Sequence, residues 1–466
     1  MWSSNSMTNI KKPKGKKSKA NKKKIHKTDV NKPYFEPDVI EKDLCTLLPK
    51  EWLASAAKAS GMIKREREIE AFEMLWVLVF SFGVHLQRNL ASMKRMYEKK
   101  SKKKLADSSW YDRFTPELTD FLKLCVTHVI EQFAMEQNKI LNEKLTKFKD
   151  VLIQDSTIIR LHESLAKKWP AARTKKVAAG VKVGMLVSAV ANSPKSIGIY
   201  PERTSEMTTL RIGPWIKDRI LLIDLGFYKH LLFSKIKQYE GSFVSRLKGN
   251  VNPLIIFAYT TCTVNNIDVK GKRLNEILPK LKGEVLDVEV EIPFKRPNYN
   301  GRSKTRMDSE RFRLVAIYNI DEEKYHIYLT DISPDVLTPE DIAKLYGARW
   351  DIELVFKELK SRYDLDVVNT TKSYTVEAYI WISILTLLIS RRIYNIVRKH
   401  SPKDKMVRYT QLRWSTIFTE NASDQLTLIL RYCGVERTFE TVMNVYQSQA
   451  LDPHVNRERF RDEWWS

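Results

Sequence analysis

Cysteine is scarce in this sequence of 466 residues. The four that occur are Cys45, Cys125, Cys262 and Cys433, and no two of them have C-x2-C spacing. The eight histidines complete no zinc-binding pattern with them. The scarcity argues against a disulfide framework and a zinc site, and it fits a reduced, cytoplasmic protein.

Signals for nucleotide binding and secretion are also absent. There is no Walker-type phosphate loop and no G-x-G-x-x-G, so nothing supports nucleotide binding. The N-terminal residues include lysines but lack the apolar run of a secretory signal. The apolar runs at 74–84 and 378–389 are shorter than the roughly 18–20 residues of a membrane span. We expect both to be buried core helices, and we expect no membrane partner.

Positive charge is what the sequence has in excess. Lysine and arginine number 80 against 56 acidic residues, which gives a formal charge of +24. This predicts a polyanionic partner: nucleic acid first, with an anionic membrane as the weaker alternative, because the charge forms no amphipathic helix. Residues 1–32 hold eleven lysines and one aspartate. We expect a disordered basic tail that contacts DNA without sequence preference or merely aids solubility.

Composition and periodicity divide the rest of the chain into segments. Its length and its 43% of hydrophobic residues predict about two to four domains with real cores. Residues 33–147 have helical periodicity, with a basic and aromatic cluster at 93–114, and they predict a helical DNA-binding domain. Residues 148–250 contain apolar, strand-like runs and a hairpin signal at 191–195. They predict the first part of a mixed α/β core.

The second half of the chain is predicted to be β-rich and then helical. Residues 251–335 alternate as strands do, and we interpret them as a β-rich insertion. Helix restarts after Thr338, which is a good N-cap, with Pro339 in the first turn and acidic residues behind it. We expect residues 336–400 to form the second part of the core, and residues 401–466 a helical C-terminal region.

The stretch YGARWDIELVFKELK, which begins at Tyr346, places four polar groups on one side of a predicted helix. At 100° per residue, they fall within a stripe about 60° wide that apolar residues border. Such a stripe should face a crevice rather than bulk water. Gly347 can break the helix just after Tyr346 and shift the phase of that residue. The four residues of the stripe are Tyr346, Arg349, Glu353 and Lys360.

A surface helix with salt bridges is the alternative interpretation of this stretch. In such a helix Glu353 pairs with Arg349 or Lys357 at four-residue spacing. Lys360 does not fit, because it lies about 10 Å along the axis from Glu353, too far for a direct pair. The residues on the opposite side, which we expect to be solvated, are Asp351 and Glu358.

Two aspartates end apolar, strand-like runs. Asp155 follows the run 151–153, and Asp224 follows the run 221–223. A buried strand seldom accepts a carboxylate without a partner, although each residue singly also fits a strand end or a turn cap. Together with Glu353 they make three carboxylates, which can hold two Mg²⁺ ions about 4 Å apart. Such a pair of ions activates a water or 3′ hydroxyl and stabilises the leaving oxygen in phosphodiester chemistry.

These residues also give the chain a resemblance to a known family. YGARWDIELVFKELK matches the signature Y-x2-R-x3-E-x6-K, and IQDSTIIRL and LIDLGFY look like the first and second aspartate strands. Over residues 145–400 the chain resembles the DDE transposases of insertion-sequence family four. The resemblance implies an α/β fold: a ribonuclease H-like catalytic core interrupted by the β-rich insertion, between helical N- and C-terminal regions.

The resemblance also implies the site residues and the metal. Asp155, Asp224 and Glu353 would be the catalytic metal ligands for two Mg²⁺ ions, with Mn²⁺ as a substitute. Other residues would hold the terminal phosphate and the DNA backbone, since Arg offers a planar fork and Lys a point charge. These are Tyr346, Arg349 and Lys360, with Arg246 and Lys248 as further candidates that an exposed strand face explains equally well.

The function that the resemblance implies is cut-and-paste transposition. The protein would bind double-stranded DNA at the inverted-repeat ends of its element, cut there, and join the 3′ hydroxyls to target DNA. A homodimer in the synaptic complex and a place in the cytoplasm at the nucleoid follow from this role. Two rivals stay open: a non-catalytic DNA-binding protein derived from a transposase, against which the intact acidic residues argue, and a related metal-dependent nuclease that does not join.

One departure from the family concerns cleavage through a DNA hairpin. Some relatives hold a flipped base with a tryptophan from the insertion, but residues 251–345 contain none. The hairpin route is therefore undecided for this chain. Aromatic residues that can stack on a base instead are Phe257, Tyr259, Phe294 and Tyr299.

Overall fold

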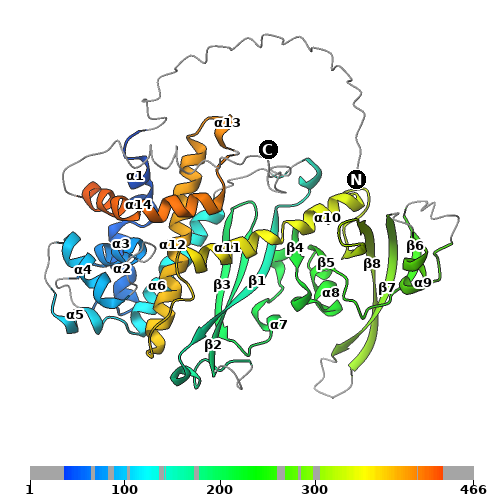
Figure 1. The fold of residues 1–466 in the computed structure, drawn as a ribbon, viewed down its shortest axis with the longest axis horizontal. Helices are drawn as coiled ribbons and strands as arrows, with labels where there is room; N and C mark the ends of the chain where they lie inside the picture. The colour runs from blue at the N-terminus through cyan, green and yellow to red at the C-terminus, as the bar shows by residue number, and fades with distance from the viewer. Residues whose placement is uncertain are drawn as a thin grey trace, which may run out of the picture.

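The computed structural model joins a helical body to a large mixed sheet (Figure 1). It describes residues 36–64, 69–81, 89–101, 105–135, 141, 143–172, 178–259, 268–281, 285–297, 305–406 and 408–433. The predicted basic tail and the end of the predicted C-terminal region lie outside the described residues. The prediction of a mixed α/β fold with helical N- and C-terminal regions is confirmed.

The N-terminal region forms the predicted helices. They are α1 (Val39–Leu47), α2 (Lys50–Ala59), α3 (Ala71–Ser81), α4 (Leu90–Ser101), α5 (Asp107–Tyr111) and α6 (Pro116–Met135). The helix α3 is apolar on almost every side, and ten of its eleven residues are buried. A helix without a polar face needs neighbours all round, and α3 packs against α2, α4 and two C-terminal helices.

Those two C-terminal helices complete the helical body. The first, α12 (Ser373–Lys399), packs on α6 and α3, and the second, α14 (Gln411–Tyr432), packs on α3 and α1; the short α13 (Lys403–Met406) lies between them. By length and composition α12 is able to cross a membrane, but 89% of its most apolar window is buried inside the protein. It is therefore a core helix, as predicted for residues 378–389. The described part of the run 74–84 is also buried.

The strands form one mixed sheet in the order β3-β2-β1-β4-β5-β9-β8-β7-β6. They are β1 (Asp150–Leu161), β2 (Ala179–Ser188), β3 (Ser193–Pro201), β4 (Arg219–Ile223), β5 (Ser242–Arg246), β6 (Leu254–Ala258), β7 (Leu286–Pro297), β8 (Thr305–Asn319) and β9 (Lys324–Thr330). The pairs β1–β4 and β4–β5 are parallel, and the other pairs are antiparallel. The predicted hairpin at 191–195 is confirmed, because it joins the antiparallel β2 and β3.

The residues predicted as a β-rich insertion supply β6 to β9 and the short helix α9 (Leu274–Ile277). Their strands extend the same sheet, because β9 pairs with β5 from Val244↔Thr330 to Arg246↔Tyr328. In Figure 1 the helical body and β6 lie at opposite ends of the molecule. The boundaries of the insertion at 251 and 335 stay a prediction.

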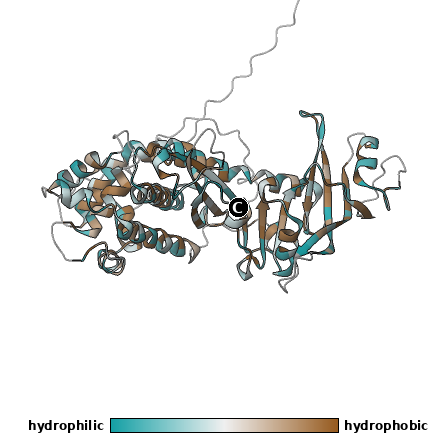
Figure 2. Cartoon of the chain, turned by 90° about the horizontal axis from the view of Figure 1, so that it is seen from below, coloured by the Kyte–Doolittle hydropathy of each residue, from teal (hydrophilic) through white to brown (hydrophobic). Residues whose placement is uncertain are grey.

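Helices cover both faces of the sheet. Successive residues of β4 point to opposite sides, as a strand requires: Ile220 and Leu222 face one core, and Leu221 and Ile223 face another. The second core lies under α8 (His230–Gln238), and the first under α10 (Pro339–Gly347) and α11 (Trp350–Ser361). Figure 2 shows brown, hydrophobic residues in the helical body and along the strands. Burial on both faces explains the unbroken apolar run in β4.

The stretch from Tyr346 to Lys360 forms two helices rather than the single helix of the prediction. A turn at Ala348 and Arg349 separates α10 from α11, directly after Gly347. The predicted cap of α10 is confirmed, since the Thr338 hydroxyl accepts from the backbone N of Asp341 at 3.2 Å. The prediction of a single helix is therefore wrong, although Ala348 and Arg349 keep helical backbone angles and Tyr346, Arg349 and Glu353 still lie close to one another.

Candidate active site

The two aspartates identified in the sequence are neighbours on two adjacent strands. Asp155 lies in β1, and Asp224 directly follows β4. These strands run parallel, and Gln154 of β1 pairs with Ile223 of β4. The next residue of each strand is one of the aspartates. The sheet therefore brings together two carboxylates that are 69 positions apart in the chain.

Backbone amides orient both carboxylates. The Ser156 N–H donates to Asp155 Oδ1 at 2.8 Å. The Gly226 N–H donates to Asp224 Oδ2 at 3.3 Å, and Asp224 thereby caps the 3-10 turn Leu225–Phe227. The turn-cap alternative for Asp224 is thus realised. It uses only one oxygen, and the Asp224 side chain keeps 40% of its surface exposed.

Arg349 connects the second aspartate to the predicted third carboxylate. Its Nη2 donates to Glu353 Oε1 at 2.8 Å, and its Nε lies 3.8 Å from Asp224 Oδ1. The helix α11 packs on β1, which brings this group over the strand that carries Asp155. The Arg349–Glu353 pair of the salt-bridge alternative therefore exists, but it forms inside an acidic cluster and not on a solvated helix face.

The pKa of Asp155 is shifted by its burial and by the charged groups of this cluster. Burial first, and then the negative charges of Asp224 and Glu353, raise the pKa of this carboxyl to about 6. The Ser156 amide and the Arg349 guanidinium oppose the rise without cancelling it. The three carboxylates are thus close enough to interact, and they carry more negative charge than one guanidinium balances.

A divalent cation fits this surplus of negative charge. Carboxylate oxygens are the ligands that Mg²⁺ prefers, and Arg349 Nε is buried without a hydrogen-bond acceptor among the described residues. Across the described part of the chain, however, no three acidic, histidine or cysteine side chains already surround one point as metal ligands. With Arg349 between Asp224 and Glu353, the carboxylates have the right chemistry but are not yet arranged around a metal.

Tyr346 borders the cluster from the end of α10. Its side chain is buried, its ring lies 5.4 Å from the ring of Tyr328, and the Arg349 guanidinium lies 5.9 Å from it. Burial raises the pKa of the Tyr346 hydroxyl to about 12. The hydroxyl therefore keeps its proton at neutral pH and is able to donate a hydrogen bond.

Lys360 reaches β1 from the far end of α11. Its Nζ donates to the backbone O of Ile158 at 3.2 Å, three residues beyond Asp155. Within the described residues Lys360 forms no ion pair, so the salt-bridge alternative does not account for its charge. A half-buried ammonium beside the acidic strand keeps hydrogen-bonding capacity for a further acceptor, since it has three donors.

The two weaker DNA-contact candidates lie at the end of β5. Arg246 is the last residue of that strand, and its charge acts on the hydroxyls of both Tyr346 and Tyr328. Lys248 follows two residues later and is exposed. Arg246 therefore borders the site, and Lys248 lies on the surface beyond it.

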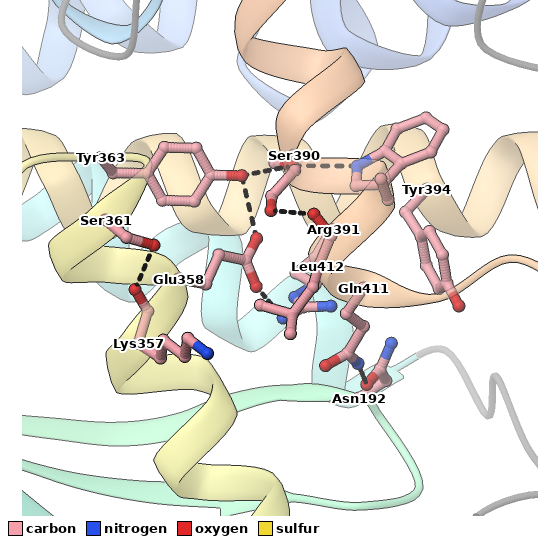
Figure 3. A network of polar contacts seen from close by, with 12 residues as sticks. Asn192, Lys357, Glu358, Ser361, Tyr363, Ser390, Arg391, Tyr394, Gln411 and Leu412 are labelled. Atoms are coloured by element: carbon pink, nitrogen blue, oxygen red, sulfur yellow. Dashed lines mark hydrogen bonds and ion pairs between the residues drawn. The ribbon is translucent and has the colours of Figure 1, made fainter. Parts of the chain in front are cut away.

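Glu358 is not the solvated residue that the helical wheel predicted. It is fully buried, its carboxylate pairs with Arg391, and the Tyr363 hydroxyl donates to its Oε1 at 2.9 Å (Figure 3). Ser390 Oγ continues the network, 2.8 Å from the Tyr363 hydroxyl and 3.0 Å from Trp414 Nε1. The prediction failed because α12 and α14 cover the side of α11 opposite the sheet, which no local pattern reveals.

The sequence also gave no reason to single out Glu206, which lies beside the aspartates. Its carboxylate is 2.9 Å from Ser156 Oγ and 2.8 Å from Lys182 Nζ. One signal was available: Lys182 is a single lysine within an apolar strand, and such a residue requires a buried acidic partner. The sequence spacing of the acidic residues does not indicate which of them pairs with Lys182.

The aromatic residues proposed to stack on a base differ in exposure. Phe294 is buried against His230, with ring centroids 6.4 Å apart, and is unavailable for stacking in this conformation. Phe257 and Tyr259 are exposed at the β6 edge of the sheet, with their rings 5.5 Å apart. Tyr299 lies outside the described residues.

A mixed α/β core with two aspartates from neighbouring parallel strands and a glutamate on a helix is the arrangement expected of an enzyme of the DDE kind. Residues 146–389 match the family described as the transposase DDE domain, which is more than half of the chain. The chain belongs to this family: it is a DDE transposase. The resemblance to family four of the insertion-sequence transposases is thereby confirmed.

Individual relatives agree with this family. The chain is 22% identical over 366 residues to the transposase for insertion sequence element IS1151 of Clostridium perfringens, covering 72% of this chain and 76% of the relative. It is 21% identical over 387 residues to the transposase for IS231F of Bacillus thuringiensis subsp. israelensis, covering 75% and 78%. A shorter match to the putative transposase InsL for IS186A of Escherichia coli (strain K12) is 32% identical over 90 residues, 19% of this chain and 24% of the relative.

Proposed function

We propose that this transposase cuts DNA at the ends of its own mobile element and joins the freed 3′ hydroxyls to target DNA. The observation that carries the proposal is the arrangement of Asp155, Asp224 and Glu353 around Arg349, on elements that lie far apart in the sequence. Two acidic neighbours and burial would make such a cluster unfavourable in a protein that had no use for it.

We assign β1 to β5 to a ribonuclease H-like core and β6 to β9 to the insertion. Two features support this assignment. The aspartates lie on the neighbouring parallel strands β1 and β4, and the helix with Glu353 packs on β1. The helical residues 33–147 are assigned to DNA binding, which fits their basic cluster at 93–114.

Asp155, Asp224 and Glu353 would hold the ions. Bound Mg²⁺, or Mn²⁺ in its place, would supply Lewis-acid activation of the attacking hydroxyl and charge neutralisation at the leaving oxygen. For Asp224 and Glu353 to present all of their oxygens to the ions, Arg349 has to give up its contacts with them. Its guanidinium is then available for a bidentate contact with a phosphate.

The remaining residues would position the DNA. Tyr346, whose hydroxyl stays protonated, donates a hydrogen bond to a phosphate oxygen next to the scissile bond. Lys360 supplies a point charge from the β1 side, and Arg246 extends the cationic border beyond Tyr346. Lys248 contacts the backbone further out. Fixed donors of this kind act through orientation and electrostatics rather than by proton transfer.

The partners follow from the reaction. The substrate is double-stranded DNA, and a homodimer would bring two element ends together for a coupled reaction. The place of action would be the bacterial cytoplasm, at the nucleoid, where the DNA lies. The rival is a related nuclease that cuts and does not join, and the assay below separates the two.

The test is cleavage and joining with purified protein. Linear DNA that carries the inverted repeats flanking the gene is incubated with a target plasmid and Mg²⁺, and both nicked ends and joined products are measured. We expect both products from the wild type and neither from Asp224→Asn, with DNA binding retained. Cleavage without joining would favour the nuclease, and normal cleavage by Asp224→Asn would refute the metal-ligand assignment.

A further inference from the structure

We propose that Glu206 is a positioning residue that ties the strand of Asp155 to the turn of Asp224. The inference rests on the proposed function, because it takes these aspartates as the metal ligands. Glu206 begins the short helix α7 (Glu206–Thr209), in the connection between β3 and β4. Nothing in its local sequence points to the site. Its role is inferred from two contacts of its side chain and from its closeness to the turn of Asp224.

The first contact is with the residue that orients Asp155. Ser156 Oγ donates to the Glu206 carboxylate, 2.9 Å from Oε2 and 3.1 Å from Oε1. The backbone N–H of the same serine donates to Asp155 Oδ1. Glu206 thus fixes the side chain of Ser156, and Ser156 fixes the carboxylate of Asp155.

The second observation is that Glu206 lies close to the turn that carries Asp224. At Gly226 a Cβ atom would lie 3.7 Å from Glu206 Cγ and 3.8 Å from Asp224 Oδ2. Glu206 and Asp224 therefore flank the same glycine, whose N–H orients Asp224. A displacement of Glu206 would thus affect both the strand at Asp155 and the turn of Asp224.

The other contact holds Glu206 itself. Lys182 of β2 is buried, and its Nζ donates to the backbone O of Thr204 at 2.6 Å and pairs with Glu206 Oε1 at 2.8 Å. The lysine anchors the loop before Glu206 and the carboxylate together. Lys182 and Ser156 both engage this carboxylate, and on our proposal Glu206 acts through these neighbours.

The structural alternative is that Glu206 only neutralises the charge of the buried Lys182. Two double variants separate this from positioning. Lys182→Met with Glu206→Gln removes both charges but keeps an acceptor for the Ser156 hydroxyl. Lys182→Met with Glu206→Ala removes the charges and the acceptor together. Both avoid leaving a buried lysine unpaired, which would cost stability.

Three quantities are measured for each variant: the unfolding temperature, Mg²⁺ binding by calorimetry on the protein–DNA complex, and the single-turnover cleavage rate. We expect the Gln double variant to be close to wild type in Mg²⁺ affinity and rate. The Ala double variant should lose about ten-fold or more in one or both, as removal of a residue that orients a ligand does. Ser156→Ala alone should show the same loss of Mg²⁺ affinity or rate. Combined with the Ala double variant, it should cause no further loss.

Glu202→Gln is the matched control. Glu202 is buried four residues before Glu206 and pairs with Arg160, but it contacts neither aspartate turn. Its loss should lower the unfolding temperature and leave Mg²⁺ binding unchanged. The positioning role would be overturned if the two double variants had equal Mg²⁺ affinity and rate. It would also be overturned if Ser156→Ala and the Ala double variant caused additive losses when combined. If the wild-type protein did not cleave DNA at all, the proposed function would be contradicted. The Mg²⁺ affinities of the two double variants would still decide the role of Glu206.

Discussion

Glu358 and Arg391 form an ion pair in which each side chain is only 1% exposed. The pair joins α11, the helix of Glu353, to α12 of the helical body. Truncation of one partner leaves the other charge buried and unpaired. Glu358→Ala should therefore lower the free energy of unfolding by about 3–5 kcal/mol.

Urea unfolding followed by circular dichroism measures this loss. The control is Lys357→Ala, which removes an exposed charge one residue earlier in the same helix and should stay within about 0.5 kcal/mol of wild type. An unchanged midpoint for Glu358→Ala would mean that the ion pair does not hold α11 in place.

Asp155 should make the stability of the metal-free protein depend on pH. Its folded pKa of about 6 lies above the ordinary value of 3.8, so the folded state binds the proton more tightly than the unfolded state. Stability should then fall as pH rises from about 4 to about 6 and stay low above that range. The loss is on the order of 2–3 kcal/mol.

Asp155→Asn should remove this loss, because the amide does not ionise. In chelator at pH 8 the variant is expected to unfold at a higher temperature than wild type, although it is inactive in cleavage. Added Mg²⁺ should stabilise the wild type and not the variant. Parallel pH profiles for the two proteins would show that Asp155 does not carry the unfavourable charge.

Lys360 is expected to act on the DNA and not on the fold. Lys360→Ala removes the ammonium beside β1 and should slow cleavage or joining by about ten-fold or more, since a charge-assisted phosphate contact contributes about 1.5–3 kcal/mol. Tyr346→Phe should have a smaller effect, because it removes a single hydroxyl. Single-turnover assays at saturating DNA measure both.

Lys357→Ala again serves as the control, because it deletes the same charge from the exposed side of α11. It should leave the rate nearly unchanged. If Lys360→Ala lowered only the unfolding temperature and the folded enzyme reacted at the normal rate, the contact with Ile158 would be structural.

The lysines at the N-terminus should contribute affinity without sequence preference. Deletion of residues 1–32 removes eleven lysines and one aspartate, and we expect weaker binding to any DNA and a smaller slope of log affinity against log salt. Titrations of end DNA and unrelated DNA at several salt concentrations measure this. An affinity loss confined to end DNA would identify the tail as a specific reader.

Cys45 and Cys433 offer a direct test of how α1 packs on α14. Their sulfurs lie 3.9 Å apart, although 388 positions separate them in the chain. A disulfide reagent such as oxidised glutathione, which takes up the two electrons, should link them, while the buried Cys125 stays reduced. Peptide mapping of a Cys262→Ser variant detects the link. Failure to link in the folded protein would argue against this packing.

The sequence by itself determined the chemistry and the local structure. Asp155 and Asp224 could be proposed because a carboxylate after an apolar run stands out, and Glu353 because its spacing from Arg349 and Lys360 is a recognisable signature. Their role as metal ligands stays a prediction. The N-cap at Thr338 and the hairpin at 191–195 were also predictable. In each case the cause lies within a few residues: a cap bonds to the next turn, and a hairpin pairs its own flanks.

Only the tertiary structure decided what covers each element. Glu358 was predicted to be solvated and is buried, because α12 and α14 lie on the face of α11 that a helical wheel assigns to water. No local sequence signal distinguishes Glu206 from other acidic residues, and only the tertiary structure places Lys182 and Ser156 beside it. Burial and the pairing of charges depend on residues tens to hundreds of positions away. An acidic side chain can therefore hold two helices together, as Glu358 does, or lie beside the candidate ligands, as Glu206 does, and local periodicity cannot distinguish the two.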